Sequence, residues 1–107
     1  MKGREWKRVY GSRERVEWVC SRRCDVCGRA PTWQYPSHNA HVVSGGTGRK
    51  AGYGWIISAC GTPGGCHHEM DHGIGKRALE RRYQVQLGDL AMEVERQWKE
   101  HESALAR

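Results

Sequence analysis

The segment "ACGTPGGCHHEMDH" (residues 59–72) places two cysteines and three histidines within fourteen positions. Thiolates and imidazoles are the preferred ligands of zinc and of several catalytic divalent ions. A soluble domain rarely concentrates these side chains without a chemical reason. The segment therefore indicates one of three arrangements: a single metal site, two metal sites, or part of an enzyme active site.

A second cysteine pair upstream supplies the partners that a structural zinc site needs. Cys24 and Cys27 form a CxxC, whose spacing lets two thiolates converge on one ion from a single turn. Cys60 and Cys66 supply the other pair. Four thiolates around a tetrahedral Zn²⁺ predict a structural zinc that joins the N-terminal half of the chain to the segment around residue 60.

Other residues near these cysteines compete for places in the zinc site. His67 is an alternative to Cys66 as the fourth ligand, whereas Cys20 is expected to be a buried helix residue. The CxxC, together with His38 and His41, also nearly matches a Cys2His2 finger. The histidines of such a finger lie on a helix, and here the intervening segment contains two prolines and β-favouring aromatic residues. The finger is therefore excluded.

The remaining histidines are candidates for a second, catalytic site. His68 and His72 are four residues apart, so on a helix both rings project from one face and can hold one divalent ion. His41 is the candidate general base, because its strand is expected to lie across the helix that carries this pair. An imidazole with a pKa near neutrality can take a proton from water while a divalent ion stabilises charge on a phosphate. His38 is a candidate third ligand or phosphate contact.

The composition predicts one small domain with a modest core. The chain has 107 residues, no Phe, and 14 Gly, so five Trp and four Tyr must supply much of its buried apolar area. A structural metal would compensate for this small core. We expect a basic, loosely held arm at residues 1–11 and a single domain at residues 12–107.

The charge and the cysteine count predict a compartment and a class of partner. The formal net charge is +6, which favours a polyanion, nucleic acid first. Arg49 and Lys50, at the tip of a glycine-rich loop, are candidates for contacts to a DNA backbone. Five cysteines, an odd number, in a sequence with no long apolar stretch argue against a disulfide scaffold and against a membrane span. The sequence therefore predicts a cytoplasmic protein with no membrane association.

Hydrophobic periodicity predicts a small α+β domain. The expected elements are a helix at 12–23, a tight turn at "CDVCG", strands at 38–43 and 54–59 that form a hairpin, a helix at 67–83, and a last helix that begins near Asp89. Gly73 and Gly75 weaken the middle of the helix at 67–83, and Leu90, Val94 and Trp98 mark the apolar face of the last helix.

With these residues placed, the chain resembles the HNH endonuclease family, in particular the small phage and prophage type associated with recombination. The resemblance covers residues 12 to 100. It rests on the segments "VEWVCSRRCDVCG", "NAHVVSGGTGRKAGYGW", "HHEMDHGIGKRALERRY" and "LGDLAMEVERQW", and on the cysteine that ends the second strand. It implies a zinc-stabilised ββα-metal (treble-clef-like) domain, with flanking N- and C-terminal helices, that hydrolyses phosphodiester bonds in DNA.

The resemblance also implies roles for individual residues. His41 matches the general base and His68 and His72 match the ligand pair of one catalytic ion, which can be Mg²⁺, Mn²⁺, Ni²⁺ or Zn²⁺. The cysteines, with Cys66 or His67 as the last, match the ligands of the structural Zn²⁺. A phage or host recombination or packaging protein is the implied partner besides DNA. The sequence departs from the family at Ala40, which replaces a common metal ligand, in the lack of the middle Asn, and in the added "GTPGG".

The leading hypothesis is therefore a metal-dependent DNA endonuclease or nickase. The departures at Ala40 and at the missing Asn favour an alternative, a non-catalytic zinc module that binds nucleic acid. A third alternative is a protein-interaction domain that docks a partner through its last helix.

Overall fold

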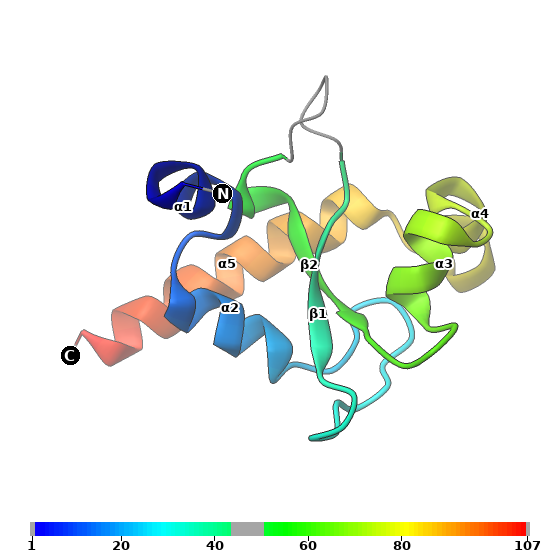
Figure 1. Ribbon diagram of the computed structural model, residues 1–107, viewed down its shortest axis with the longest axis horizontal. Helices are drawn as coiled ribbons and strands as arrows, with labels where there is room; N and C mark the ends of the chain where they lie inside the picture. Colours follow the sequence, from blue (N-terminus) through cyan, green and yellow to red (C-terminus); the bar gives the residue numbers. More distant parts are fainter. Residues whose placement is uncertain (1, 44–50, 107) are drawn as a thin grey trace.

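A two-stranded antiparallel sheet and the helix that follows it form the centre of the protein (Figure 1). The computed structural model describes residues 2–43 and 51–106. The elements in order are α1 (Gly3–Tyr10), α2 (Arg13–Cys20), β1 (Ser37–His41), the 3-10 helix η1 (Tyr53–Trp55), β2 (Ile56–Cys60), α3 (Cys66–His72), α4 (Lys76–Tyr83) and α5 (Leu87–Leu105). The fold is a small, compact α+β domain, as the sequence predicts. Within the described ranges, no helix is long and apolar enough to cross a membrane.

The hairpin of β1 and β2 confirms the two strands expected near residues 38–43 and 54–59. The register pairs Ser37 with Cys60 and His41 with Ile56. Every residue of β2 is buried, because α2 and α5 pack against it as well as α3. A strand covered on both faces has a mostly apolar sequence, and "GWIISA" is apolar apart from Ser58.

The side chains of β1 alternate between two different surroundings. Ser37, Asn39 and His41 face the N-terminal part of the chain, where their side chains hydrogen-bond to backbone carbonyls of Arg22, Val16 and Val9 respectively. Ala40 points the other way, into the core, and His38 contacts α3. His38 and His41 therefore lie on opposite faces of the sheet.

The N-terminal segment is a helix and not the loosely held arm expected at residues 1–11. α1 packs against α2 and η1, and its Val9 is completely buried (0% exposed). The Trp6 and Tyr10 rings lie one turn apart on α1, with centroids at 5.6 Å. The sequence gives little warning of this packing, because the apolar residues are few and are surrounded by Lys and Arg.

The helix expected at 67–83 is divided into α3 and α4. Gly75 adopts a φ of 89°, a left-handed conformation that a continuous helix does not contain. The last helix begins at Leu87, two residues before the expected start near Asp89, and Asp89 lies in its first turn. Glu80 of α4 provides a hydrogen-bond acceptor for the first turn of α5. Its carboxylate accepts from the Leu87 backbone N–H at 2.8 Å.

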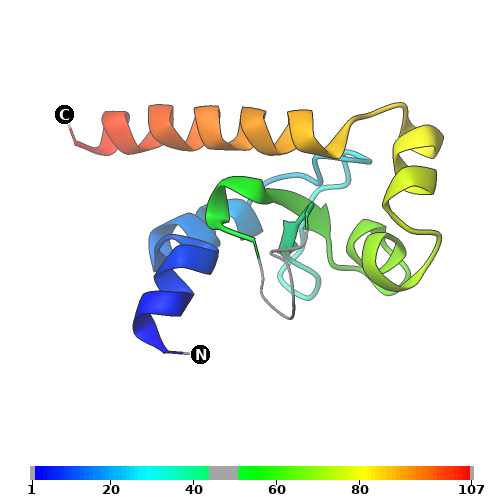
Figure 2. The same cartoon turned by 90° about the horizontal axis from the view of Figure 1, so that it is seen from above.

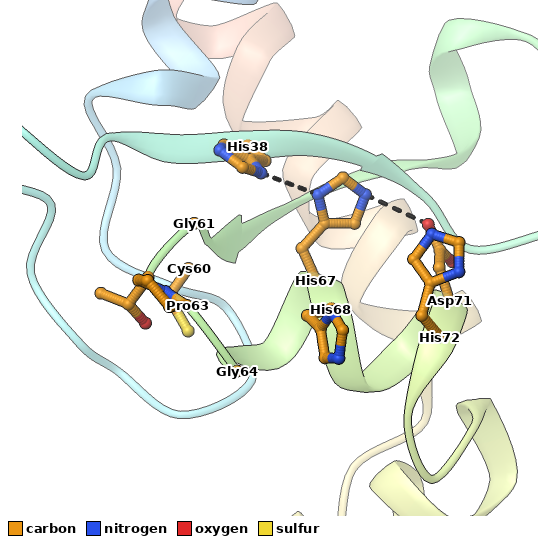
Figure 3. Close-up of a pocket in the computed structure, with 10 residues that line it drawn as sticks. His38, Cys60, Gly61, Pro63, Gly64, His67, His68, Asp71 and His72 are labelled. Carbon is orange, nitrogen blue, oxygen red and sulfur yellow. Dashed lines mark hydrogen bonds and ion pairs between the residues drawn. The ribbon is translucent and has the colours of Figure 1, made fainter.

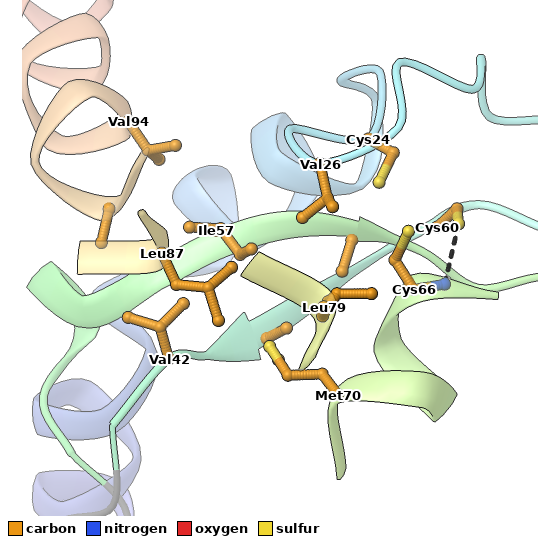
Figure 4. Packing of buried hydrophobic residues seen from close by; sticks show 13 residues of the cluster. Cys24, Val26, Val42, Ile57, Cys60, Cys66, Met70, Leu79, Leu87 and Val94 are labelled. Carbon is orange, nitrogen blue, oxygen red and sulfur yellow. Dashed lines mark hydrogen bonds between the residues drawn. The ribbon is translucent and has the colours of Figure 1, made fainter. Parts of the chain in front are cut away.

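Helix α5 closes one side of the sheet and then extends beyond the rest of the domain (Figure 2). Ala91, Val94 and Trp98 are its buried face, and the first two belong to one core cluster with the strands. That cluster combines aliphatic residues with three of the cysteines (Figure 4). The core is thus small, and cysteine side chains form part of it.

The burial of α1 can be tested by truncating its one fully buried side chain. We expect Val9→Ala to lower the free energy of unfolding by about 1.5 kcal/mol, since it removes two buried carbon groups. Lys7→Ala on the exposed side of the same helix is the control and should change it by less than about 0.5 kcal/mol. Chemical denaturation measures both, and equal stability of the two variants would mean that α1 is loosely held.

Candidate metal centre and histidine pocket

Four cysteines from three separate segments meet in one cluster. Cys24 and Cys27 lie on the turn after α2, Cys60 ends β2, and Cys66 begins α3. Their four sulfur atoms all lie within 4.8 Å of one another, and the Cys27 and Cys60 sulfurs are 3.7 Å apart. Tetrahedral zinc with Zn–S bonds of about 2.3 Å requires S–S separations of about 3.8 Å. The donor set and its spacing therefore suit a metal ion such as zinc.

The turn that carries the CxxC is fastened to the hairpin. The Asp25 backbone N–H donates to the Ser58 carbonyl at 2.8 Å, and the Asp25 carboxylate accepts from the Ser58 N–H at 2.7 Å. Gly28, with a φ of 79°, lets the chain reverse, and its N–H donates to the Cys24 carbonyl at 2.9 Å. The cysteines of this turn are thus held beside the end of β2.

The cluster favours the thiolate form at Cys24 and disfavours it at Cys27 and Cys66, whose pKa values are raised, chiefly by burial at Cys27 and by the hydrogen bond to Cys24 at Cys66. A hydrogen bond from the Cys66 thiol lowers the pKa of Cys24 to about 4, and the same interaction raises the pKa of Cys66. Backbone N–H groups contribute as well, because the Cys27 N–H donates to the Cys24 sulfur and the Cys66 N–H donates to the Cys60 sulfur at 3.1 Å. Negative charge is therefore stabilised at one sulfur, and four neighbouring thiolates would need a bound cation to offset their mutual repulsion.

The structure decides between the alternative ligands. Cys66 belongs to the cluster, whereas His67 does not: its Nδ1 lies 2.8 Å from Nδ1 of His38. Cys20 is also outside the cluster, partly buried on α2, and its sulfur accepts a hydrogen bond from the Asn39 amide. The candidate metal centre is therefore a cluster of four cysteines.

A pocket of about 310 Å³ lies beside the cysteine cluster, between the start of β1, the loop after β2, and α3 (Figure 3). Its chemistry-bearing lining residues are His38, His67, His68, Asp71 and His72. Cys60 and the loop that joins β2 to α3 form another wall. Four of the six histidines of the chain are therefore gathered at one place.

Within this pocket, three side chains form a hydrogen-bonded chain. Nε2 of His67 lies 3.2 Å from the Asp71 carboxylate, and Nδ1 lies 2.8 Å from Nδ1 of His38. Burial lowers the pKa of His67, and the Asp71 carboxylate only partly offsets that effect. A neutral His67 that donates its Nε2–H to Asp71 must accept at Nδ1, so the Nδ1–H of His38 is the donor. In that arrangement the lone pair of a neutral His38 ring lies on Nε2.

Gly61 provides the surface on which the His38 ring rests. A β-carbon at Gly61 would overlap the His38 ring and would lie 2.6 Å from the Pro36 carbonyl oxygen. The close approach of these atoms therefore requires glycine at position 61. Its backbone conformation does not, because its φ lies outside the left-handed region. Neither Gly61 nor Asp71 is among the residues that the sequence pattern predicts for the site. The i, i+4 spacing of His67 and Asp71 was the available signal for the latter.

His68 and His72 share one face of α3, as their spacing predicts. Both are exposed, and their ring centroids are 5.9 Å apart. In residues 2–43 and 51–106, the cysteine cluster alone brings three or more ligand atoms within 4.8 Å of one another. The two imidazoles can therefore supply two ligands to an exchangeable ion, with water or a bound phosphate completing its shell.

His41 does not lie across from this pair, and the expected placement is wrong. Its Nε2 lies 2.9 Å from the Val9 carbonyl oxygen, and its ring meets Tyr10 edge-on with centroids at 5.6 Å. The cause is strand alternation, which turns residue 41 toward α1 while residue 38 faces α3. The other expected DNA contacts, Arg49 and Lys50, fall outside the described residues.

No family model, curated protein or solved structure matches this chain. The resemblance to HNH endonucleases accordingly rests on the residue pattern described above.

The metal centre predicts one tightly held zinc per chain. We expect serine at any of the four clustered cysteines to abolish zinc retention and cooperative folding, because a structural site of this type contributes directly to stability. Cys20→Ser is the matched control and should retain both. Elemental analysis after dialysis, together with thermal unfolding, measures the effect. Zinc retention by a Cys66→Ser protein would contradict the four-cysteine assignment.

The close approach at Gly61 predicts that Gly61→Ala displaces His38. We expect a loss of about 1–3 kcal/mol in stability, because both a ring and a backbone carbonyl must move. The imidazole NMR signals of His38 and His67 should change together. Gly54→Ala, where a β-carbon meets nothing within 4 Å, should leave both unchanged. Unchanged His38 signals in Gly61→Ala would refute the contact.

Proposed function

We propose that the protein is a metal-dependent endonuclease that hydrolyses phosphodiester bonds in DNA. The observation that carries this proposal is the pocket beside the cysteine cluster, which is lined by His38, His67, His68, Asp71 and His72. Several imidazoles around one open pocket suit a polyanionic substrate and proton transfer near pH 7. The order of β1, β2 and α3 is also the order that the resemblance to HNH nucleases implies.

In this proposal the residues of the pocket have separate roles in proton transfer and in metal binding. His38 accepts a proton from water at Nε2, since its Nδ1–H is engaged by His67, and Asp71 in turn fixes the orientation of His67. His68 and His72 hold the exchangeable divalent ion. When bound, that ion supplies electrostatic stabilisation of the negative charge that develops on the phosphate.

His38 thereby takes the role that the sequence pattern gave to His41. The reason is geometric: His38 lines the pocket, whereas His41 is hydrogen-bonded to the N-terminal helix on the other face of the sheet. The assignment of DNA as the substrate is supported by the net charge of +6.

The placement of His41 also favours the second candidate function, a zinc module that binds nucleic acid without cleaving it. In that case the cysteine cluster would serve folding alone, and the exposed His68 and His72 would contact phosphates. The two functions differ in whether any bond is broken.

A plasmid-nicking assay with the zinc-loaded protein and added Mg²⁺, Mn²⁺, Ni²⁺ or Zn²⁺ decides between them. We expect cleavage by the wild type and a loss of about 100-fold or more in His38→Ala, because a general base contributes at least that much. His68→Ala and His72→Ala should reduce cleavage and raise the metal concentration required. His101→Ala, on α5 and outside the pocket, is the control.

The outcomes separate the parts of the proposal. Absence of cleavage by the wild type with every metal would refute the nuclease and leave the binding module. A large loss of cleavage activity in His41→Ala, with full activity in His38→Ala, would show that His41 is the general base. Equal activity of the His68→Ala, His72→Ala and wild-type proteins would show that α3 does not hold the divalent ion.

A further inference from the structure

The loop between the CxxC turn and β1 presents a tryptophan almost entirely to solvent. Trp33 is 95% exposed, more than any other large apolar side chain that the structure describes. Trp98, by contrast, is buried in the core. Exposing an indole of this size forgoes about 1.5–3 kcal/mol of burial, so Trp33 does not serve the fold.

The exposed ring is carried on an ordered turn. The Thr32 backbone N–H donates to the Tyr35 carbonyl at 3.1 Å, and the Tyr35 N–H donates to the Thr32 hydroxyl at 2.9 Å. Pro31 and Pro36 flank this turn and restrict the backbone on both sides. Trp33 and Gln34 therefore form the tip of a turn that is closed by two hydrogen bonds, and the indole is presented with little loss of conformational entropy on binding.

This turn is joined directly to the histidine pocket. The Pro36 carbonyl and the His38 ring both lie against Gly61, which lines the pocket. Pro36 is three positions after Trp33, so their Cα atoms are at most about 11 Å apart even in an extended chain. The backbone that carries the indole is therefore close to the edge of the pocket.

The surroundings of the turn favour a polyanionic ligand over a protein. From Val26 to His68 the chain contains no Asp or Glu, and this stretch includes the turn, both strands, and the loop that lines the pocket. Tyr35 is the other exposed aromatic residue of the turn, and the polar Thr32 and Gln34 flank Trp33, so the exposed apolar area is confined to one turn and is smaller than the area that protein partners bury. An exposed aromatic ring on a segment without carboxylates suits stacking on a nucleobase.

We propose that Trp33 is a stacking platform for an unpaired nucleobase, and that the preferred substrate is DNA with a single-stranded or unpaired nucleotide near the phosphate bound in the histidine pocket. This inference rests on the proposed function, because it names the substrate class of the same site. Unpaired bases are specified because bases inside a duplex are already stacked on both faces and cannot receive the indole without being extruded.

Fluorescence anisotropy with a labelled 12-nucleotide oligothymidine and a duplex of equal length tests the inference, with the zinc-loaded full chain and no added divalent ion. We expect Trp33→Ala to weaken single-strand binding by about 5- to 150-fold, the range of one lost base–aromatic stack. Trp33→Phe should retain most of the affinity. Duplex binding should be unchanged in both variants, and Gln34→Ala, at the same turn, should bind both probes like the wild type.

Two outcomes would overturn the inference. In one, Trp33→Ala binds the single strand as tightly as the wild type, as expected if the indole docks a protein. In the other, Trp33→Ala loses single-strand and duplex affinity equally. Neither depends on catalysis: loss of single-strand binding in Trp33→Ala with no cleavage by the wild type would refute the nuclease alone, whereas cleavage with unchanged binding would refute the stacking platform alone.

Discussion

The rest of the structure depends on the meeting of four cysteines from three separate segments, a set that could hold one metal ion such as zinc. A two-stranded hairpin is only marginally stable by itself, and the described core around it contains small aliphatic side chains and no phenylalanine. The cysteine cluster compensates by tying together the turn after α2, the end of β2 and the start of α3. Since Cys66 is followed directly by His67, the same tie orients the helix on which three of the pocket histidines lie.

Features that depend on local spacing were predictable from the sequence. The two cysteine pairs indicate a candidate metal centre without knowledge of the fold, because the chemistry of thiolates and the geometry of a CxxC turn restrict what they can do. The hairpin was predictable for a similar reason: β2 is buried on both faces and its sequence is apolar apart from Ser58. The sequence could not show whether Cys66 or His67 is the fourth member of the cluster, because side chains of adjacent residues can reach nearly the same point.

Features that depend on which side of an element a side chain occupies could not be predicted from the sequence. A strand seen in the sequence has two faces, and a shift of one residue exchanges them, so neither periodicity nor spacing could tell whether His38 or His41 faces α3. The helix α1 was missed because its packing rests chiefly on Val9, which a short charged segment does not signal. The division of α3 from α4 depends on the backbone of Gly75, and a glycine within an amphipathic pattern is compatible with either a break or a continuous helix.

The loop of residues 61–65 contributes to both the histidine pocket and the cysteine cluster. One side lines the histidine pocket, and the loop as a whole connects Cys60 to Cys66, two ligands of the cysteine cluster. Substitutions there would alter pocket shape and metal geometry together, so this wall has little freedom to vary. Changes in what the pocket accepts would arise more easily in the turn that carries Trp33, whose tip bears no cysteine and lies outside the core. The pocket thus has one wall that is constrained by the cysteine cluster, and the segment leading to His38 carries a turn that is free of that constraint.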